Sequence, residues 1–282
     1  MQTILRGRNS QVLIDTNGPV VIIGESINPT RRKKLVTTLE KGDFDYVLEL
    51  AQIQVNEMAD VLDVNVGYPG VDDVHLLPQV VKALNEKFDI PLSLDSPDPK
   101  AIEAALKVAK GKCLINSVNG TKQSMEALLP VAKEYGAAVI ALAMDEEGIP
   151  SIPGKRLNIA EKIVETATMY GINEEDIIID PLAMAVSADP EACLITLSAT
   201  RMIRDKLGLN ITLGASNISF GLPDRNALNV AFITLAIQSG VTCPIGNPSG
   251  ITSVVRAADL ILGRDEYALR FVEHFQMTHN DR

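Results

Sequence analysis

The sequence predicts an α/β protein of the (β/α)8 TIM-barrel class with a small N-terminal hairpin extension. Eight short apolar runs rich in β-branched residues alternate with amphipathic helical patterns, which favours a parallel sheet covered by helices. In 282 residues each such unit has about 35 residues, which suits a barrel of roughly 250 residues plus an extension. A doubly wound open sheet is the alternative, although no GxGxxG motif follows the first run.

A hairpin and eight strands are predicted in order from the N-terminus. The segments ILRG and QVLID, on either side of Arg8-Asn9-Ser10, predict a hairpin that caps the barrel. The runs that follow are apolar without interruption, as expected of parallel strands buried on both faces, and they end in small or Asx residues. These runs comprise residues 20–28, 61–67, 91–96, 112–120, 137–145, 176–181, 211–219 and 241–247.

Helices are predicted between the strands from apolar spacing and from end signals. Asp98 and Pro99 have the residue types of an N-cap and a first helical position. Glycines that end helices are expected at Gly136, Gly171 and Gly240. The apolar face of the first helix is predicted to contain Val47, Ala51, Val55 and Met58. That of the third is predicted to contain Ile102, Ala105, Leu106 and Ala109.

Composition and charge exclude several classes of protein. A formal charge of −10 leaves no long basic stripe for a nucleic-acid backbone, so we expect no nucleic-acid partner. No apolar run approaches the roughly 20 residues that cross a bilayer, and the first residues do not resemble a signal peptide. We therefore expect no membrane partner and a cytoplasmic location. Because no break in composition divides the chain, residues 1–282 are expected to form a single domain.

The cysteines argue against a metal centre in this chain. Cys113, Cys193 and Cys243 form no CxxC pair, and no His lies near them at the spacing of metal ligands. We expect a reducing compartment and no metal bound by the chain itself.

Polar residues gather where the apolar runs end. In a barrel of this class the reacting groups lie at the carboxyl ends of the strands, the end called the mouth below. The residues predicted there are Asn28, Asp63, Asn65, Asp95, Asn116, Asp145, Asp180, Asn217 and Asn247. Amides and carboxylates without a nucleophile are poorly suited to hydrolysis or Schiff-base chemistry, but they can pair with a flat heterocycle rich in hydrogen-bond donors. A reduced pterin is such a ligand, and nucleobases have similar edges.

Six motifs along this ring resemble one family. They are IGESIN (23–28), LDVNVG (62–67), LDS (94–96), INSVNG (115–120), IIDP (178–181) and GASNISFGLPDR (214–225). Over residues 20–265 the chain resembles the pterin-binding methyltransferases, and more narrowly the methyltetrahydrofolate:corrinoid protein methyltransferases. These are relatives of the folate domain of cobalamin-dependent methionine synthase. The resemblance implies a barrel that transfers a methyl group between N5 of methyltetrahydrofolate and the cobalt of a corrinoid. It also implies a homodimer.

The resemblance also implies roles for individual residues. Asn217 approaches N5 and is the expected catalytic hydrogen-bond donor. The pterin ring is held by Asp95, Asn116 and Asp180, the floor of the site is supported by Asp63 and Asn65, and the remaining matches are Arg225 and Asn28. Because the chain has no recognisable cobalamin-binding module, the cobalamin is expected on a separate corrinoid protein.

One departure and two alternatives accompany this interpretation. Some relatives have Gln shortly after the Asn, whereas Phe220 follows Ser219 here, which leaves the contact to the aminobenzoyl tail and the corrinoid partner open. A dihydropteroate synthase would need a basic motif after the seventh strand, where ASNISFG stands instead. A folate-binding protein without turnover is the other alternative, and the presence of Asn217 argues against it.

Overall fold

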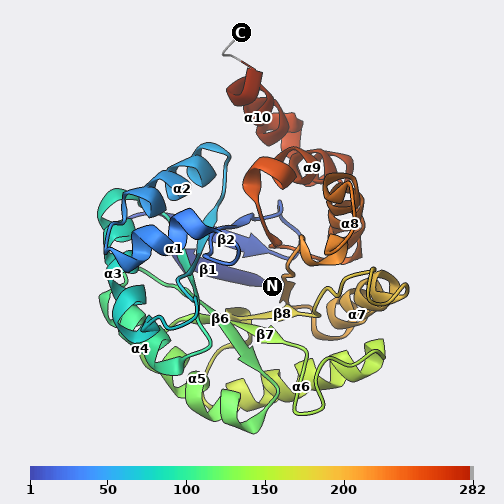
Figure 1. Cartoon of the computed structure of the whole chain (residues 1–282). Coiled ribbons are helices and arrows are strands. Elements are labelled where there is room, and N and C mark those ends of the chain that lie inside the picture. Colours follow the sequence, from blue (N-terminus) through green and yellow to red (C-terminus); the bar gives the residue numbers. More distant parts are fainter. Residues whose placement is uncertain (280–282) are drawn as a thin grey trace.

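The computed structural model describes residues 1–279 and contains a closed parallel barrel (Figure 1). Its eight strands follow the order β10-β3-β4-β5-β6-β7-β8-β9. The first and last strands are joined by a parallel bridge between Gly214 and Ile245, with a hydrogen bond of 2.8 Å from the Ala215 N–H to the Ile245 carbonyl. The predicted barrel is confirmed, and the open sheet is excluded by this closure.

Seven of the eight strands fall within the predicted runs, and β9 begins one residue before its run and shares only Ile211 with it. Their bounds are β3 (Ile23–Ile27), β4 (Val61–Asn65), β5 (Leu92–Asp95), β6 (Leu114–Asn119), β7 (Ala138–Leu142), β8 (Ile177–Asp180), β9 (Asn210–Ile211) and β10 (Ile245–Gly246). Side chains alternate between the barrel interior and the helical layer, so that Ile178 lies inside while Ile179 packs outward. The outward side chains form the larger apolar core between strands and helices.

Helices surround the strands, and α10 projects beyond the ring (Figure 1). Their bounds are α1 (Lys33–Glu40), α2 (Asp45–Asn56), α3 (Asp73–Lys87), α4 (Pro99–Val108), α5 (Lys122–Tyr135), α6 (Pro153–Met169), α7 (Ala192–Leu207), α8 (Arg225–Ser239), α9 (Pro248–Ile261) and α10 (Leu269–His279). Short 3-10 turns lie at η1 (Glu174–Asp176), η2 (Asn217–Ser219) and η3 (Glu266–Ala268). No helix within residues 1–279 is long and apolar enough to cross a membrane.

The predicted helix ends are largely confirmed. Asp98 accepts a hydrogen bond of 2.9 Å from the Lys100 N–H, with Pro99 at the first position of α4. Gly136 caps α5 with a left-handed backbone, at φ of +61°. Met58 was wrongly placed on the first helix: α2 ends at Asn56, and Met58 has a left-handed φ of +64° in the turn to β4.

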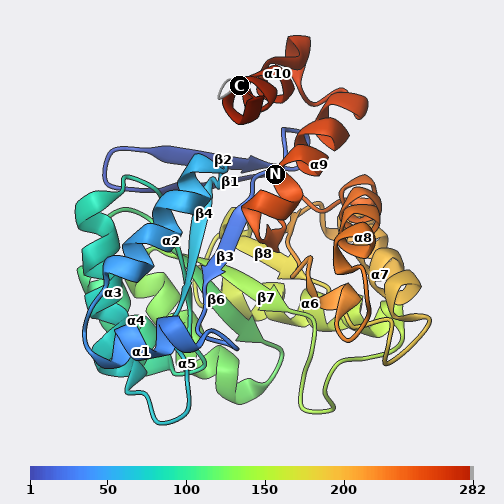
Figure 2. The ribbon, with the colours of Figure 1, turned by 45° about the horizontal axis from the view of Figure 1, so that its top comes forward.

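The N-terminal hairpin closes the amino-terminal end of the barrel (Figure 2), as predicted. Its strands β1 (Gln2–Arg6) and β2 (Gln11–Asp15) pair antiparallel. Leu5 and Ile14 are fully buried among the inward side chains of the barrel. The side-chain amide of Asn210 on β9 donates to the Ile14 carbonyl over 2.9 Å. Apolar contacts and a buried hydrogen bond therefore hold the hairpin over this end of the barrel.

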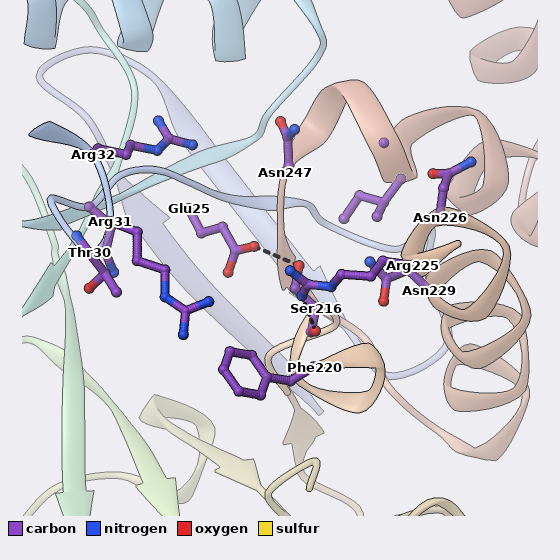
Figure 3. A pocket seen from close by; sticks show the side chains of 13 residues that line it. Glu25, Thr30, Arg31, Arg32, Ser216, Phe220, Arg225, Asn226, Asn229 and Asn247 are labelled. Atoms are coloured by element: carbon purple, nitrogen blue, oxygen red, sulfur yellow. Dashed lines mark hydrogen bonds between the residues drawn. The ribbon is translucent and has the colours of Figure 1, made fainter. Parts of the chain in front are cut away.

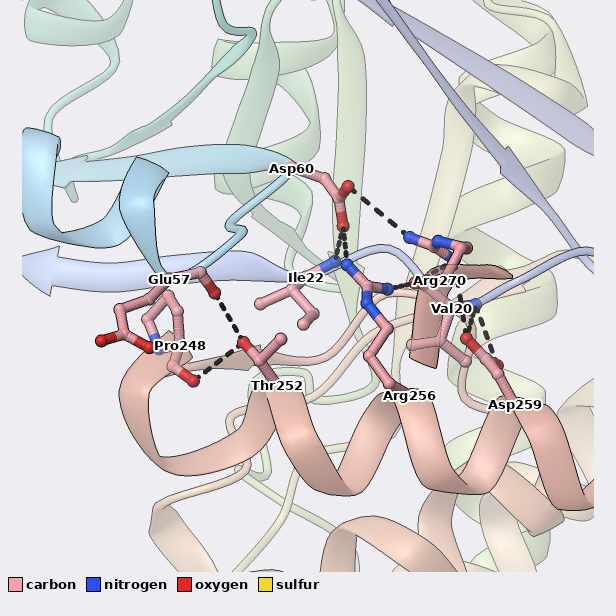
Figure 4. Close-up of polar contacts among 9 residues, drawn as sticks. All are labelled: Val20, Ile22, Glu57, Asp60, Pro248, Thr252, Arg256, Asp259 and Arg270. Atoms are coloured by element: carbon pink, nitrogen blue, oxygen red, sulfur yellow. Dashed lines mark hydrogen bonds and ion pairs between the residues drawn. The ribbon is translucent and has the colours of Figure 1, made fainter. Parts of the chain in front are cut away.

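A network of charges joins α9 and α10 to the starts of β3 and β4 (Figure 4). Asp60 accepts from the Ile22 N–H over 2.7 Å, and Asp259 accepts from the Val20 N–H over 3.0 Å. Arg270 lies 3.8 Å from Asp60 and 3.6 Å from Asp259, and Arg256 lies 4.0 Å from Asp60. Each of these two carboxylates thus has at least one arginine beside it and a backbone donor.

Candidate functional site

Four of the predicted residues lie together at the mouth as two hydrogen-bonded pairs, called the cluster below. The Asn65 amide donates to Asp95 over 2.9 Å, and the Asn116 amide donates to Asp63 over 3.1 Å. The strand register explains the meeting, because Asn65 pairs with Asp95 and Asp95 pairs with Asn116 at the same level of the sheet. Below them, the Ser93 hydroxyl donates to Asp63 over 2.7 Å. The amides and the hydroxyl together fix the directions of both carboxyl groups.

The electrostatics of this cluster favour protonated carboxyls. Burial raises the pKa of Asp63 to about 8, and the neighbouring charges of Asp95 and Glu25 act in the same direction. Burial likewise raises the pKa of Asp95, although the hydrogen bond from Asn65 opposes it. Within residues 1–279 no Lys or Arg lies within 4 Å of either carboxyl group. A ligand that donates N–H groups would satisfy these oxygens.

Asp180 ends β8 and points into the barrel, because it lies two residues beyond the inward Ile178. Its side chain is buried, and one carboxylate oxygen accepts from the Leu182 N–H over 2.7 Å. Burial raises the pKa of Asp180 to about 7, against the opposing effects of the Leu182 N–H and the Arg156 charge. Asp180 is therefore close to its titration midpoint at neutral pH.

Asn217 begins the short turn η2 and is exposed at the mouth. Two side chains hold this turn: the Ser216 hydroxyl donates to Glu25 over 2.8 Å, and Arg225 donates to the Ser216 carbonyl over 2.8 Å. Arg225 also donates to the Ser219 hydroxyl over 3.0 Å. Arg225 thus supports the backbone that presents Asn217.

A cavity of about 710 Å³ opens between β3, the η2 turn and the start of α9 (Figure 3). Arg31 and Arg225 line it, and the Arg31 guanidinium lies 4.9 Å from the ring centre of Phe220. Asn28 lies at its edge and accepts from the Thr30 N–H over 3.0 Å. This cavity combines positive charge with an exposed aromatic ring.

A second cavity, of about 440 Å³, includes Asp95 and Asn116. Not every residue of the predicted ring reaches the two cavities. Asn247 lines the first cavity. Asp145 instead lies in a separate hollow with Glu147 and Lys155, where its backbone forms an antiparallel β-bridge with Gly148. The loop after β7 turns back on itself, and Asp145 lies in this loop rather than at the end of the strand.

Three side chains at the site were not among the predicted residues. Glu25 contacts Ser216, Ser93 contacts Asp63, and Arg156 approaches Asp180. The alternation of β3 could have indicated Glu25, because it lies two residues beyond the inward Ile23. Arg156 lies on a helix, and no local pattern connects it with the end of β8.

The chain is similar to known proteins in sequence and in fold. The family described as pterin binding enzyme matches residues 24–245. A methylcorrinoid:tetrahydrofolate methyltransferase of Eubacterium limosum is 29% identical over 91% of this chain and 96% of its own length. The methionine synthase of Mycobacterium tuberculosis is 31% identical over 84% of this chain, which matches 21% of that longer protein. In structure, a dihydropteroate synthase of Yersinia pestis superimposes with a TM-score of 0.72 over 93% of this chain and 99% of its own, at 19% identity.

Proposed function

The chain belongs to the family of pterin binding enzymes, and on this premise we propose that it is a methyltetrahydrofolate:corrinoid protein methyltransferase. It moves a methyl group between N5 of methyltetrahydrofolate and the cobalt of a corrinoid carried by a separate protein. The observation that carries the proposal is the cluster of Asp63, Asn65, Asp95 and Asn116, whose carboxyls have no Lys or Arg within 4 Å among residues 1–279. The similarity to the Eubacterium limosum methyltransferase supports the same activity.

The cluster and Asp180 bind the pterin ring in this proposal. The ring N–H and the exocyclic amino group of a pterin form a two-point donor edge, which one carboxylate can accept. Asp95 and Asp180 are the acceptors, and the Asn116 amide faces the ring nitrogens and the carbonyl oxygen. Asp63, one layer below, and Asn65, at the same level, act indirectly, since their polar atoms already orient Asn116 and Asp95.

Asn217 acts on the reacting nitrogen. When the methyl group leaves N5 as a cation equivalent, the bonding electron pair stays on N5 and the nitrogen becomes more basic. A hydrogen bond from the Asn217 amide therefore strengthens during the transfer. This lowers the free energy of the transition state relative to that of the bound substrate. The methyl acceptor is a Co(I) corrinoid, which supplies the nucleophile. The proton that N5 finally takes comes from water or a neighbouring group, because an amide is not a general acid.

The cavity in Figure 3 suits the remainder of the folate. The exposed Phe220 ring offers a stacking surface for the aminobenzoyl group, and Arg31 above it offers positive charge to the glutamate carboxylates. Two of the four basic residues between Arg31 and Lys34, namely Arg31 and Arg32, line this cavity.

Titration calorimetry with methyltetrahydrofolate, followed by an absorbance assay with free Co(I) cobalamin, tests the proposal. We expect binding and loss of the Co(I) absorption band. Dihydropterin diphosphate and p-aminobenzoate are added in a parallel assay, in which we expect no dihydropteroate. Absence of folate binding contradicts the proposal, binding without transfer to cobalamin or to a corrinoid protein indicates a folate-binding protein, and formation of dihydropteroate indicates a synthase.

A further inference from the structure

Arg156, on the first turns of α6, is a buried charge that binds three carbonyl groups. Its side chain is 2% exposed. Its Nε donates to the Pro150 carbonyl over 2.8 Å, and its Nη1 donates to the carbonyls of Pro181 and Leu182 over 2.6 Å each. Arg156 therefore ties the loop that follows β7 to the turn that follows β8.

The charge of Arg156 needs an explanation beyond these carbonyls. Among the described residues no carboxylate forms an ion pair with it, and burial lowers its pKa. Burying a guanidinium is unfavourable, and a neutral amide could satisfy some of the same carbonyls at a smaller desolvation cost. Asp180 is the carboxyl group that the Arg156 charge acts on.

The turn that Arg156 holds has a strained backbone. Leu182 has a left-handed φ of +66°, a conformation that is unfavourable for a residue other than glycine. Its N–H donates to Asp180, while its carbonyl accepts from Arg156 and, over 3.0 Å, from the hydroxyl of Thr196 on α7. Thr196 is fully buried, so the peptide groups of Leu182 are held from two helices. A strained backbone that several surrounding contacts hold in place is typical of functional sites, where a side chain must keep one orientation.

We infer that Arg156 is a positioning residue for Asp180. By fixing the carbonyls of Pro181 and Leu182, it keeps the Leu182 N–H on one carboxylate oxygen and leaves the other available to a ligand at the mouth. Its charge also favours the ionised form of Asp180, which is the form that accepts two N–H groups. That the ligand is a pterin rests on the proposed function, whereas the coupling between Arg156 and Asp180 does not.

The groups that act on Asp180 can be separated by mutation. They are the Arg156 charge and the Leu182 N–H. The buried thiol of Cys243, in the segment before β10, has its own pKa raised by burial and in addition by the Asp180 charge. Arg156→Met removes charge and hydrogen bonds together. Arg156→Lys retains the charge, but it cannot donate from two nitrogens, as Nε does to Pro150 and Nη1 does to Pro181 and Leu182. Thr196→Val retains the charge and removes the hydroxyl that donates to the Leu182 carbonyl and accepts from Arg156 over 3.4 Å.

The test is a titration of Asp180 in the free protein, followed by the ¹³C signal of its carboxyl carbon and assigned with Asp180→Asn. We expect a midpoint near 7 in the wild type, a midpoint about one unit higher in Arg156→Met, and nearly the wild-type midpoint in Arg156→Lys and Thr196→Val. Pteroate affinity is expected to fall about tenfold in Arg156→Lys and less in Thr196→Val.

Two outcomes overturn the inference. One is an unchanged Asp180 midpoint in folded Arg156→Met, and the other is full retention of affinity in Arg156→Lys, which would make donation from two nitrogens unnecessary. Should Arg156→Met fail to fold, a shifted midpoint in Arg156→Lys would equally contradict the role of charge. Because the titration needs no ligand, failure of the wild type to bind a pterin contradicts the proposed function while the midpoints still decide the inference.

Discussion

The buried carboxyl groups at the two ends of the barrel have different charged neighbours. At the amino-terminal end, Asp60 and Asp259 receive backbone N–H groups and lie beside Arg256 or Arg270, which oppose the effect of burial on their pKa (Figure 4). At the mouth, Asp63 has a second carboxyl group, Asp95, as its charged neighbour, and this neighbour adds to the effect of burial.

This difference indicates which end is built for stability and which for binding. A buried carboxylate with a neighbouring arginine and backbone donors has both its charge and its hydrogen-bond acceptors paired within the folded chain. Two adjacent carboxyls without a cation destabilise the fold unless a proton or a ligand reaches them, and such clusters are typical of functional sites. The next four predictions test this contrast, in decreasing order of the expected change in free energy, which for the dependence on pH is taken per pH unit.

The largest effect is expected from Arg256→Met at the amino-terminal end. Arg256 is 1% exposed, and its removal leaves Asp60 with a single neighbouring arginine, the partly exposed Arg270 at 3.8 Å. Loss of one partner from a buried charge network lowers the free energy of unfolding by about 3–5 kcal/mol. Urea denaturation measures this change. Lys107→Met, which breaks an exposed pair with Glu103, is the control and should cost no more than about 0.5 kcal/mol. Equal losses in both variants would contradict the contrast.

Asn217→Ala tests the mouth, where a substitution should reduce the rate of methyl transfer rather than the free energy of unfolding. We expect methyl transfer to slow by about 10²-fold, close to 2.7 kcal/mol of lost transition-state stabilisation, with folate affinity kept within roughly tenfold. Single-turnover kinetics with Co(I) cobalamin and calorimetry with methyltetrahydrofolate give the two numbers. Asn173→Ala, at an exposed position outside the mouth, is the matched control. A parallel loss of rate and affinity would show that Asn217 binds the ground state equally well.

Asp63 should make stability depend on pH in a specific direction. Its pKa is near 3.8 when unfolded and about 8 when folded, so between these values the folded protein binds more protons. The free energy of unfolding therefore falls as pH rises through this window, by up to about 1.4 kcal/mol per pH unit. In Asp63→Asn this decline should be smaller, and the variant should gain on the wild type between pH 5 and pH 8. Denaturation midpoints across that range test it, and parallel curves for the two proteins would refute it.

The sequence could predict what depends on local pattern. Apolar runs and helix ends predicted the strands, the hairpin and the Asx residues at the mouth, because alternation and capping act within a few residues. The same rules failed where the chain leaves regular structure, as at Met58 and Asp145. Arg156 and Arg256 could not be foreseen, because each contacts segments that only the closed barrel brings together.

Arg270→Gln gives the smallest expected effect and separates burial from the number of charge contacts. Arg270 approaches both Asp60 and Asp259, whereas Arg256 forms an ion pair with Asp60 alone. Its side chain is nevertheless 27% exposed, so that water screens both contacts, and the buried Asp259 keeps its hydrogen bonds from the Val20 N–H. We expect Arg270→Gln to lower the free energy of unfolding by no more than about 1 kcal/mol in the same urea experiment. A loss as large as that of Arg256→Met would mean that the contact number, rather than burial, decides how firmly this end of the barrel is held.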